Sequence, residues 1–518
     1  MPAKNEFLCI LPDKPGMMAK RLEVRPQHLE GIKPLVEAGS VVAGGAMLDK
    51  HPAEGESMSF QGSMMMVLAE TKEEAEALIK NDIYTKSGVW DLDKAQIIPN
   101  CQFVQPKHQY TQDLIMPSNE SQPQAGNNAV LRNINPSYTG FDHIRWYVGN
   151  ARQAATYFVA QFGFNIVAYR GPETGSHLSC SYVVTNGNAR FVFTAPITSP
   201  NNTWDKRASG ADRQQLDEIH AHLTKHGDGV KDIAFAVDDV TGVWEHAVQH
   251  GAISIQEPKL LKDQSGEVRS ATIQTYGDTA HTLINRSAYQ GIFLPGYQAV
   301  SGQDRLNDLL PEIDVIEIDH CVGNQGWDGL DSIVKYYEDA LNFHRYWTVD
   351  DKDMCSEYSA MRSIVMASPN EVIKMPMNEP ATGLKKSQIE EFVEYYNGPG
   401  CQHIAFRTPN ILQAVENLTT RGVTFLSVPE TYYANMRTRL ASANITLAED
   451  INLLQKYNIL IDFDEGGYLL QIFTKHVVDR PTVFLEIIQR ENFDGFGAGN
   501  FKSLFEAFER DQEMRGNL

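Results

Sequence analysis

The sequence of 518 residues predicts an α+β protein, with an N-terminal ferredoxin-like βαββαβ domain followed by two open barrels built from paired βαβββ modules. Three features predict this class: alternating strand and helix patterns in the first hundred residues, a polar stretch after them, and a fourfold repeat in the remainder. We therefore expect a domain at 1–105, a flexible linker at 106–138, a structural barrel at 139–300 and a second barrel at 301–518.

The composition limits the classes of partner. The net charge of −21 argues against nucleic acid and anionic membranes, because both bind basic surfaces. Six cysteines are scattered without a CxxC pair, which favours free thiols in a reducing compartment. There is no signal peptide pattern and no run of 18 apolar residues, so we expect a cytoplasmic protein.

The first 105 residues alternate strand and helix patterns in a ferredoxin-like order. Branched and apolar residues predict strands at 7–11, 41–48, 64–69 and 95–104. Apolar residues at helical spacing predict one helix over 25–38, which Pro34 should kink, and a capping box at 71–74 opens a second helix. The segment 117–128 that follows is polar and lacks periodic apolar residues, which is typical of a linker.

From residue 139 onward the chain repeats one plan, in which a strand with a polar or histidine residue is followed by a helix and further strands. The four repeats begin at residues 141–144 (FDHI), 230–235 (VKDIAF), 318–321 (IDHC) and 401–406 (CQHIAF). Modules of this kind pair into open sheets that curve around a central cavity. The repeat therefore predicts two barrels of two modules each.

Three residues of the second barrel interrupt apolar strands with groups that are costly to bury unpaired. These are His320, His403 and Glu486, and 83 residues separate each from the next. Strand alternation turns each of them toward the same side as mostly apolar neighbours, as a barrel interior requires. Two imidazoles and one carboxylate form the facial triad of mononuclear non-haem Fe(II) enzymes, which leaves coordination positions open.

The repeat provides an internal test of this metal hypothesis. Alignment of the two halves places His143 opposite His320, Asp232 opposite His403 and Thr282 opposite Glu486. Since threonine is a poor ligand for Fe(II), we expect a single metal in the second barrel and a structural first barrel. For His143 the favoured interpretation is a hydrogen-bonded core histidine.

Residues 139–518 resemble the 4-hydroxyphenylpyruvate dioxygenase family, which has the vicinal oxygen chelate fold. The motifs that carry the resemblance are residues 318–324 (IDHCVGN), 376–380 (PMNEP), 386–389 (KSQI), 400–405 (GCQHIA), 470–475 (LQIFTK), 484–486 (FLE) and 495–501 (GFGAGNF). The resemblance implies one Fe(II) per chain, with His320, His403 and Glu486 as ligands. It also implies a substrate pocket lined by Ser363, Asn378, Gln388, Gln402, Gln471, Phe473, Phe496, Asn500 and Phe501.

The resemblance implies a reaction as well: an aromatic 2-oxo acid, 4-hydroxyphenylpyruvate, and O2 would give homogentisate and CO2 in tyrosine and phenylalanine catabolism. A hydroxymandelate synthase on the same substrate is the nearest alternative, although Pro376 and Phe473 match the ring-hydroxylating pattern. An extradiol catechol dioxygenase is disfavoured by residues 378–380 and the Gly-rich motif. A non-catalytic ligand-binding module of the same fold is the third alternative, which a metal assay would distinguish.

Strand alternation also orders the pocket candidates. Gln471 and Phe473 share a strand face, so both can point inward, whereas strict alternation turns Gln402 to the face opposite His403. Phe496 and Phe501 flank a Gly-rich turn before a predicted helix at 503–514, which could cover the cavity as a lid. Without the resemblance, that turn reads as a plain loop and Phe501 as a hydrophobe that docks the helix.

Residues 5–104 resemble the YCII-like domain family around His28, Gly44-Gly45 and residues 81–84 (NDIY). The resemblance implies acid–base work for His28 and Asp82. The structural alternative is that His28 is a surface helix residue and Asp82 a cap at a helix end. We expect this domain to serve oligomerisation or another accessory role, with a second activity as the alternative, in a homodimer or higher homo-oligomer.

Overall fold

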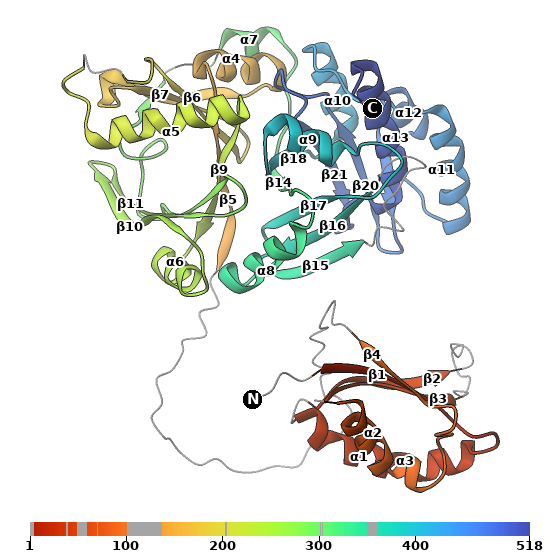
Figure 1. Ribbon diagram of the computed structural model, residues 1–518. Coiled ribbons are helices and arrows are strands. Elements are labelled where there is room, and N and C mark those ends of the chain that lie inside the picture. The colour runs from red at the N-terminus through yellow and green to blue at the C-terminus, as the bar shows by residue number, and fades with distance from the viewer. Residues whose placement is uncertain are drawn as a thin grey trace, which may run out of the picture. The chain divides into compact units, whose positions relative to one another are not determined.

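A computed structural model describes residues 5–37, 40–48, 60–69, 71–100, 137–201, 205–300, 302, 304–349 and 360–517. The chain forms two compact units, Met1–Asn128 and Ala129–Leu518 (Figure 1). Most of the predicted linker falls at residues 101–136, outside the described residues, so the linker and the domain boundaries stay predictions. Among the described residues, no helix is long and apolar enough to cross a membrane.

The first unit has the predicted ferredoxin-like fold, with a four-stranded antiparallel sheet in the order β2-β3-β1-β4. Its elements are β1 (Asn5–Pro12), α1 (Met18–Glu37), β2 (Val41–Leu48), β3 (Phe60–Ala69), α2 (Lys72–Asn81), α3 (Ile83–Lys86) and β4 (Gln96–Asn100). Helix α1 begins seven residues before the predicted start and continues past Pro34. As the capping box predicts, the Thr71 hydroxyl accepts a hydrogen bond from the Glu74 N–H at the start of α2.

The second unit contains the four predicted βαβββ modules, two in each barrel. The first barrel consists of β5 (Tyr138–Tyr147), α4 (Ala151–Phe162), β6 (Asn165–Arg170), β7 (Ser179–Asn186), β8 (Ala189–Pro196), α5 (Gly210–His226), β9 (Gly229–Val237), α6 (Val240–Gln249), β10 (Ser254–Asp263), β11 (Gly266–Gln274) and β12 (Ala280–Asn285). A short 3-10 helix, η1 (Pro172–Thr174), strand β13 (Gln298–Ala299) and helix α7 (Arg305–Leu309) complete this half. Its strands form one sheet in the order β10-β11-β12-β9-β5-β8-β7-β6-β13.

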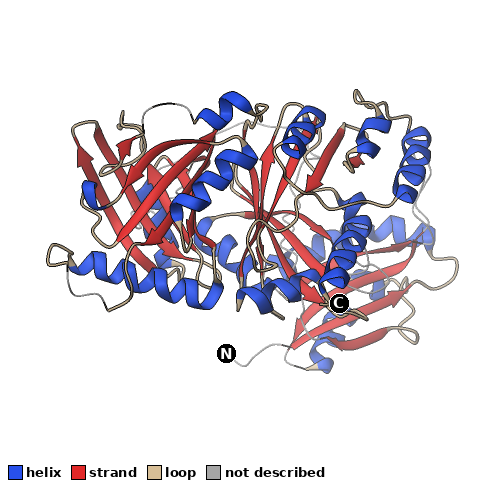
Figure 2. Ribbon diagram, turned by 90° about the horizontal axis from the view of Figure 1, so that it is seen from above, coloured by secondary structure: helices blue, strands red, loops and turns tan. Residues whose placement is uncertain are grey.

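The second barrel repeats this plan and adds helices. It consists of β14 (Glu317–Asn324), α8 (Leu330–Leu341), β15 (His344–Val349), β16 (Ala360–Ala367), β17 (Lys374–Ala381), α9 (Gln388–Tyr396), β18 (Gly400–Arg407), α10 (Ile411–Thr420), α11 (Glu430–Ala443), α12 (Ile451–Lys456), β19 (Leu460–Phe463), β20 (Tyr468–Phe473), β21 (Phe484–Glu491), η2 (Ala498–Asn500) and α13 (Phe501–Arg515). The sheet order is β15-β16-β17-β14-β18-β21-β20-β19, which matches the first barrel module by module. Figure 2 shows helices along the outer sides of both curved sheets.

The strand register reproduces the alignment of the two halves. His320 on β14 pairs with Ala405 on β18, as His143 on β5 pairs with Ala234 on β9. On the neighbouring parallel strands, His403 pairs with Phe484 and Asp232 pairs with Ala280. Two residues further on, Glu486 and Thr282 therefore occupy equivalent positions, as the repeat predicted.

One hydrophobic core extends through both barrels. Phe406 of β18 lies 5.5 Å from the Phe191 ring of β8 and 5.6 Å from the Phe164 ring, measured between centroids. Such aromatic contacts fix the two sheets against each other as one packed body. The sites inside the two barrels are therefore held in a common frame.

Candidate metal centre

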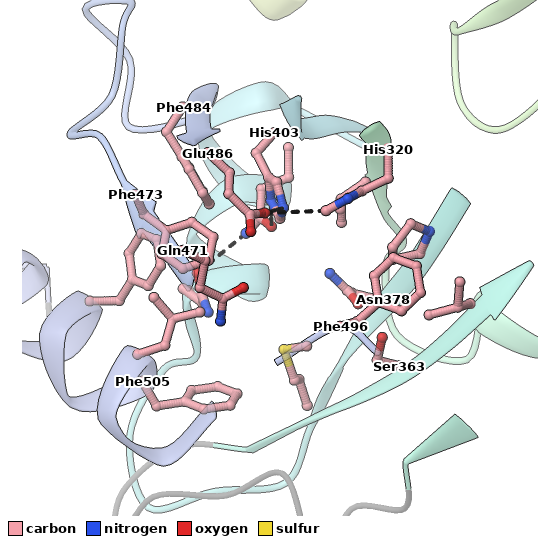
Figure 3. Close-up of a pocket in the computed structure, with 18 residues that line it drawn as sticks. His320, Ser363, Asn378, His403, Gln471, Phe473, Phe484, Glu486, Phe496 and Phe505 are labelled. Atoms are coloured by element: carbon pink, nitrogen blue, oxygen red, sulfur yellow. Dashed lines mark hydrogen bonds and ion pairs between the residues drawn. The ribbon is translucent and has the colours of Figure 1, made fainter. Parts of the chain in front are cut away.

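The three predicted ligands come from three neighbouring strands of the second barrel, β14, β18 and β21. Glu486 Oε2 lies 3.2 Å from His320 Nε2 and 3.4 Å from His403 Nε2. The ligand atoms of all three side chains lie within 4.8 Å of one another (Figure 3). In the part of the chain that the structure describes, this is the one group of three or more such side chains placed to hold a metal.

The chemistry of this group fits a divalent metal ion. Glu486 is 2% exposed, and its second oxygen, Oε1, is buried without a hydrogen-bond partner. A buried carboxylate with an unpartnered oxygen costs several kcal/mol unless a cation occupies the position it faces. Two imidazoles and one carboxylate on one side of a cavity form the ligand set expected for a metal with open coordination positions.

A salt bridge behind His320 fixes the orientation of its ring. His320 Nδ1 lies 2.7 Å from Asp319 Oδ1, and Arg490 donates two hydrogen bonds of 2.8 Å to the same carboxylate. Burial alone would raise the pKa of Asp319, but the hydrogen bonds from Arg490 and His320 hold it well below its usual range. The Nδ1–H therefore donates to Asp319, and Nε2 is directed toward the metal position.

The same charges make the centre attractive to cations. Burial would lower the pKa of His320, but Glu486 and Asp319 raise it to about 9. Without a metal, the two carboxylates thus favour a proton on the ring. A divalent ion can take the place of that proton, since metal binding and proton release are coupled at such sites.

Gln402 orients the second histidine, in contrast to the expectation from strand alternation. Its Oε1 lies 3.2 Å from His403 Nδ1, and its Nε2 donates to Gln388 Oε1 at 3.3 Å. The prediction that Gln402 faces away from His403 is wrong because the ladder between β14 and β18 shifts beside it. Val322 pairs with His403 and Gly323 with Cys401, which leaves Gln402 as the extra residue of a bulge.

A cavity of about 60 Å³ adjoins the three ligands. Seven of the nine predicted pocket residues line it: Ser363, Asn378, Gln388, Gln402, Gln471, Phe473 and Phe496. Asn500 is not among the lining residues; it is buried and accepts a hydrogen bond of 2.7 Å from the Tyr432 hydroxyl. The side chain of Phe501 lies outside the described residues.

The sequence analysis missed most of the apolar wall. The lining residues it did not assign to the pocket are Val322, Met361, Val365, Pro376, Phe484, Leu504, Phe505 and Phe508. Three of these lie on α13, which begins two residues before the predicted helix at 503–514. Their spacing of one, three and four residues is that of a helix face, and this signal could have identified them.

The Gly-rich loop before α13 packs closely on the amide of Gln471. Gly497 has a φ of +74°, and a Cβ there would lie 2.2 Å from Gln471 Nε2. A side chain at this position would therefore displace the amide. In the same loop, the Phe496 ring lies 5.2 Å from the His320 ring, so the loop closes the cavity beside the metal position.

The N-terminal candidates meet in the first unit. His28 is 8% exposed, and its Nδ1 lies 2.8 Å from both oxygens of Asp82. The His28 ring also stacks on Tyr84 with centroids 4.0 Å apart. Asp82 accepts a hydrogen bond from the Tyr84 N–H, so it does cap a helix, as the structural alternative held. The alternative that His28 lies on the surface is wrong.

The equivalent positions of the first barrel offer no comparable metal group. His143 Nδ1 lies 2.6 Å from Asp142 Oδ1, which agrees with the favoured interpretation of a hydrogen-bonded core histidine. Asp232 accepts 2.8 Å hydrogen bonds from the backbone N–H and the hydroxyl of Thr282. Its carboxylate is thus engaged by protein groups where the second barrel has a ligand.

Paired βαβββ modules with a candidate metal group of two histidines and a glutamate on their inner strands define a protein of the vicinal oxygen chelate class. The family model of the glyoxalase/bleomycin resistance protein/dioxygenase superfamily matches residues 317–472. The model of the YCII-related domain matches residues 6–93. The expected YCII-like domain and the expected vicinal oxygen chelate fold are thereby confirmed.

Comparison with known proteins identifies the family within this class. The chain is 64% identical over 397 residues to a probable 4-hydroxyphenylpyruvate dioxygenase 2 of Aspergillus fumigatus, covering 76% of this chain and 98% of the relative. It is 50% identical over 380 residues to the 4-hydroxyphenylpyruvate dioxygenase of Dictyostelium discoideum, covering 73% of this chain and all of the relative. The chain belongs to the 4-hydroxyphenylpyruvate dioxygenase family.

A solved structure agrees with this fold at lower similarity. A triple mutant of 4-hydroxymandelate synthase from Streptomyces coelicolor has a TM-score of 0.61 and 30% identity, and covers 73% of this chain and all of that chain. The relatives align over nearly their whole length with three quarters of this chain. They therefore have little room for a counterpart of the N-terminal unit.

Proposed function

We propose that this protein converts 4-hydroxyphenylpyruvate and O2 to homogentisate and CO2 in tyrosine and phenylalanine catabolism, with one Fe(II) per chain. The observation that carries the proposal is the buried group of His320, His403 and Glu486, whose carboxylate has an unpartnered oxygen beside a cavity lined by aromatic and amide side chains. Membership of the dioxygenase family supports the choice of substrate.

In this proposal, His320, His403 and Glu486 hold the ion, and the groups behind them hold the ligands. A bound Fe(II) supplies the redox chemistry that activates dioxygen, which amino-acid side chains lack. Asp319 accepts the Nδ1 proton of His320, and Gln402 accepts that of His403, so both Nε2 lone pairs remain available. Arg490 neutralises Asp319 and keeps it ionised.

The cavity walls provide substrate orientation. The rings of Phe473 and Phe496 approach those of His403 and His320 edge-on, at 5.9 and 5.2 Å between centroids, and offer apolar faces to an aromatic substrate. The amides of Asn378 and Gln471 are 4% and 3% exposed and can bond the phenol or the oxo acid. Three side chains of α13 cover the same cavity and keep water out.

Helix α13 serves as the lid. The free space of about 60 Å³ lies well below the roughly 300–1,000 Å³ of pockets that hold compounds of drug size, so the cavity has to widen to admit the substrate. Leu504, Phe505 and Phe508 form the side of the cavity that belongs to α13. Lids of this kind exclude water during the reaction and open for product release. The exposed Met514 on the same helix gives a control position for testing this role.

Product analysis tests the proposal. Protein reconstituted anaerobically with Fe(II) is mixed with 4-hydroxyphenylpyruvate and air, and the aromatic product is identified beside a chelator-treated sample. Homogentisate, formed only with metal, is the expected result. Hydroxymandelate would leave the metal centre standing and replace the reaction by that of the structural neighbour. No product and no retained iron would indicate a non-catalytic binding module.

For the N-terminal unit we propose an oligomerisation or accessory role in a cytoplasmic homodimer or larger homo-oligomer. The relatives match about three quarters of this chain with nearly their whole length, which leaves little room in them for this unit and supports a role outside the reaction itself. The buried His28–Asp82 pair is the observation that favours the alternative, a second acid–base activity. Deletion of residues 1–110 should change the oligomer measured by light scattering; an unchanged oligomer and turnover would contradict the first role.

A further inference from the structure

The first barrel contains a cavity of about 290 Å³ that no part of the proposed reaction uses. It occupies the position that corresponds to the metal centre of the second barrel, with His143 and Thr282 on its wall. The lining comes from β5, β6, β9 to β12, helix α5 and residues 294–297. Its volume is close to that of a pocket for a small organic molecule.

Four cationic side chains line this cavity: Arg145, Arg170, Lys231 and Lys259. Among the described residues, no carboxylate forms an ion pair with any of them, and Arg170 Nε is buried without a hydrogen-bond partner. Burial and the neighbouring Arg170 and Arg145 lower the pKa of Lys259. In a chain with a net charge of −21, a cavity lined by four cations and two carboxylates has an excess of positive charge, which indicates a site for an anion.

The two carboxylates on the cavity wall balance only part of this charge, because four cations face two anions. Asp232 attracts Arg145 and accepts 2.8 Å hydrogen bonds from the backbone N–H and the hydroxyl of Thr282, and Glu218 is exposed on α5, as Lys259 is on β10. Lys231 donates to the backbone oxygen of Asp278 at 2.5 Å, which binds its proton without cancelling its charge. An incoming carboxylate would supply the missing counter-charge and hydrogen-bond acceptors.

His143 indicates a second feature of the ligand, a hydrogen-bond donor. Its Nδ1 lies 2.6 Å from Asp142 Oδ1, so the proton of the neutral ring resides there. Burial lowers the pKa of His143, which favours this neutral form. The other nitrogen, Nε2, is buried without a partner and carries a lone pair, so it can accept a hydrogen bond from a ligand hydroxyl.

We propose that the first barrel binds a small hydroxy acid, with its carboxylate on the cluster of Arg145, Arg170, Lys231 and Lys259 and its hydroxyl donating to His143 Nε2. This site is separate from the metal centre, and it does not depend on the proposed reaction. The first barrel is thus a ligand-binding domain as well as a structural one.

Isothermal titration calorimetry of the full-length, metal-loaded protein with 4-hydroxyphenylacetate tests this site. The binding constant is compared for the wild type and the variants Arg170→Gln and Lys259→Gln, with Lys262→Gln as the matched control. Lys262 lies on the same strand as Lys259, and it is paired with Glu267 at 2.7 Å outside the cavity. Thermal unfolding of each variant establishes that the fold is retained.

Each cavity variant should weaken binding by at least about tenfold, because it removes a charge-assisted hydrogen bond to the ligand carboxylate. Lys262→Gln should bind like the wild type. Wild-type affinity in both cavity variants, or no binding by the wild type, would overturn the proposal. Loss of binding in Gln471→Leu alone would place the ligand in the second barrel and overturn it too.

Two analogues test the contacts of the ligand hydroxyl and of the ligand carboxylate separately. Phenylacetate lacks the hydroxyl and 4-hydroxyphenylethanol lacks the carboxylate, so both should bind at least about tenfold more weakly. Equal affinity of all three compounds would contradict the proposed contacts. Turnover of 4-hydroxyphenylpyruvate by Arg170→Gln should equal that of the wild type, so this binding test and the test of the reaction can fail independently.

Discussion

In each barrel an arginine and an aspartate hold a buried histidine through its Nδ1. The two barrels differ in the groups that surround the other ring nitrogen, Nε2. In the first barrel Arg286 pairs with Asp142, which lies 2.6 Å from His143 Nδ1. In the second, Arg490 pairs with Asp319, which lies 2.7 Å from His320 Nδ1. The arginine–aspartate–histidine arrangement therefore stabilises a histidine inside this type of barrel whether or not a metal group is present.

The capacity to bind a metal comes from the other two strands. His403 and Glu486 are the candidate ligands on β18 and β21, where the first barrel has Asp232 and Thr282 hydrogen-bonded to each other. The lining residues of the two cavities differ as well. Cations line the first cavity, whereas aromatic rings, amides and the side chains of α13 line the second. Two side chains and one terminal helix thus account for the difference between a candidate metal centre and a polar cavity in two barrels of the same fold.

Exchange of the third ligand should have the largest effect. Glu486→Ala should abolish retained iron and reduce turnover by more than about 100-fold, since even the loss of a group behind a ligand costs 10–100-fold. Thr282→Ala, at the equivalent position, should leave both unchanged. Elemental analysis measures the iron retained by the two variants, and homogentisate formation measures their turnover. Equal losses of iron and turnover in both variants would show that the barrels do not differ as described.

Removal of the arginine comes next in size. Arg490→Met removes the arginine that pairs with the buried Asp319 and leaves it with the hydrogen bond from His320. This should lower the free energy of unfolding by roughly 3–5 kcal/mol and iron affinity by about 10–100-fold. Arg286→Met should cost less stability, because Arg190 still lies 3.9 Å from Asp142, and it should not alter iron affinity. Urea unfolding and metal titration provide the readouts. A loss of iron affinity in Arg286→Met would contradict the separation of the two sites.

The proposed lid, α13, covers the cavity of the second barrel, and shortening one of its side chains should have an intermediate effect. Phe508→Ala removes a ring 5.0 Å from Phe484 and opens the cavity to water, so kcat/KM should fall about tenfold. Met514→Ala, on the exposed side of α13, is the control and should retain wild-type kinetics. Steady-state assays with 4-hydroxyphenylpyruvate measure kcat/KM of both variants. A wild-type kcat/KM in Phe508→Ala would argue against a lid.

The smallest effect is expected at the bulge. Gln402→Leu removes the acceptor 3.2 Å from His403 Nδ1 and should weaken iron binding by about threefold to tenfold. Lys231 is the equivalent residue of the first barrel, and Lys231→Leu should leave iron binding intact. Competition of iron with a chromogenic chelator measures both, and identical constants for Gln402→Leu and wild type would remove Gln402 from the centre.

Local patterns in the sequence predicted much of this molecule. The repeat gave the number of modules and the equivalence of Thr282 with Glu486, because strand pairing preserves the spacing within each module. The inward direction of His320, His403 and Glu486 followed from the period of two along a strand. The same rule failed at Gln402, since a bulge depends on how two strands far apart in the sequence pair.

What the sequence alone determined is the set of modules, their order and the three candidate metal ligands, because these depend on local periodicity and residue type. Only the tertiary structure decided that Arg490 reaches Asp319 across 171 residues, that Glu486 Oε1 has no partner and that four cations line one cavity of the first barrel. Such contacts depend on sheet curvature, strand register and packing between distant segments. No single stretch of sequence contains that information.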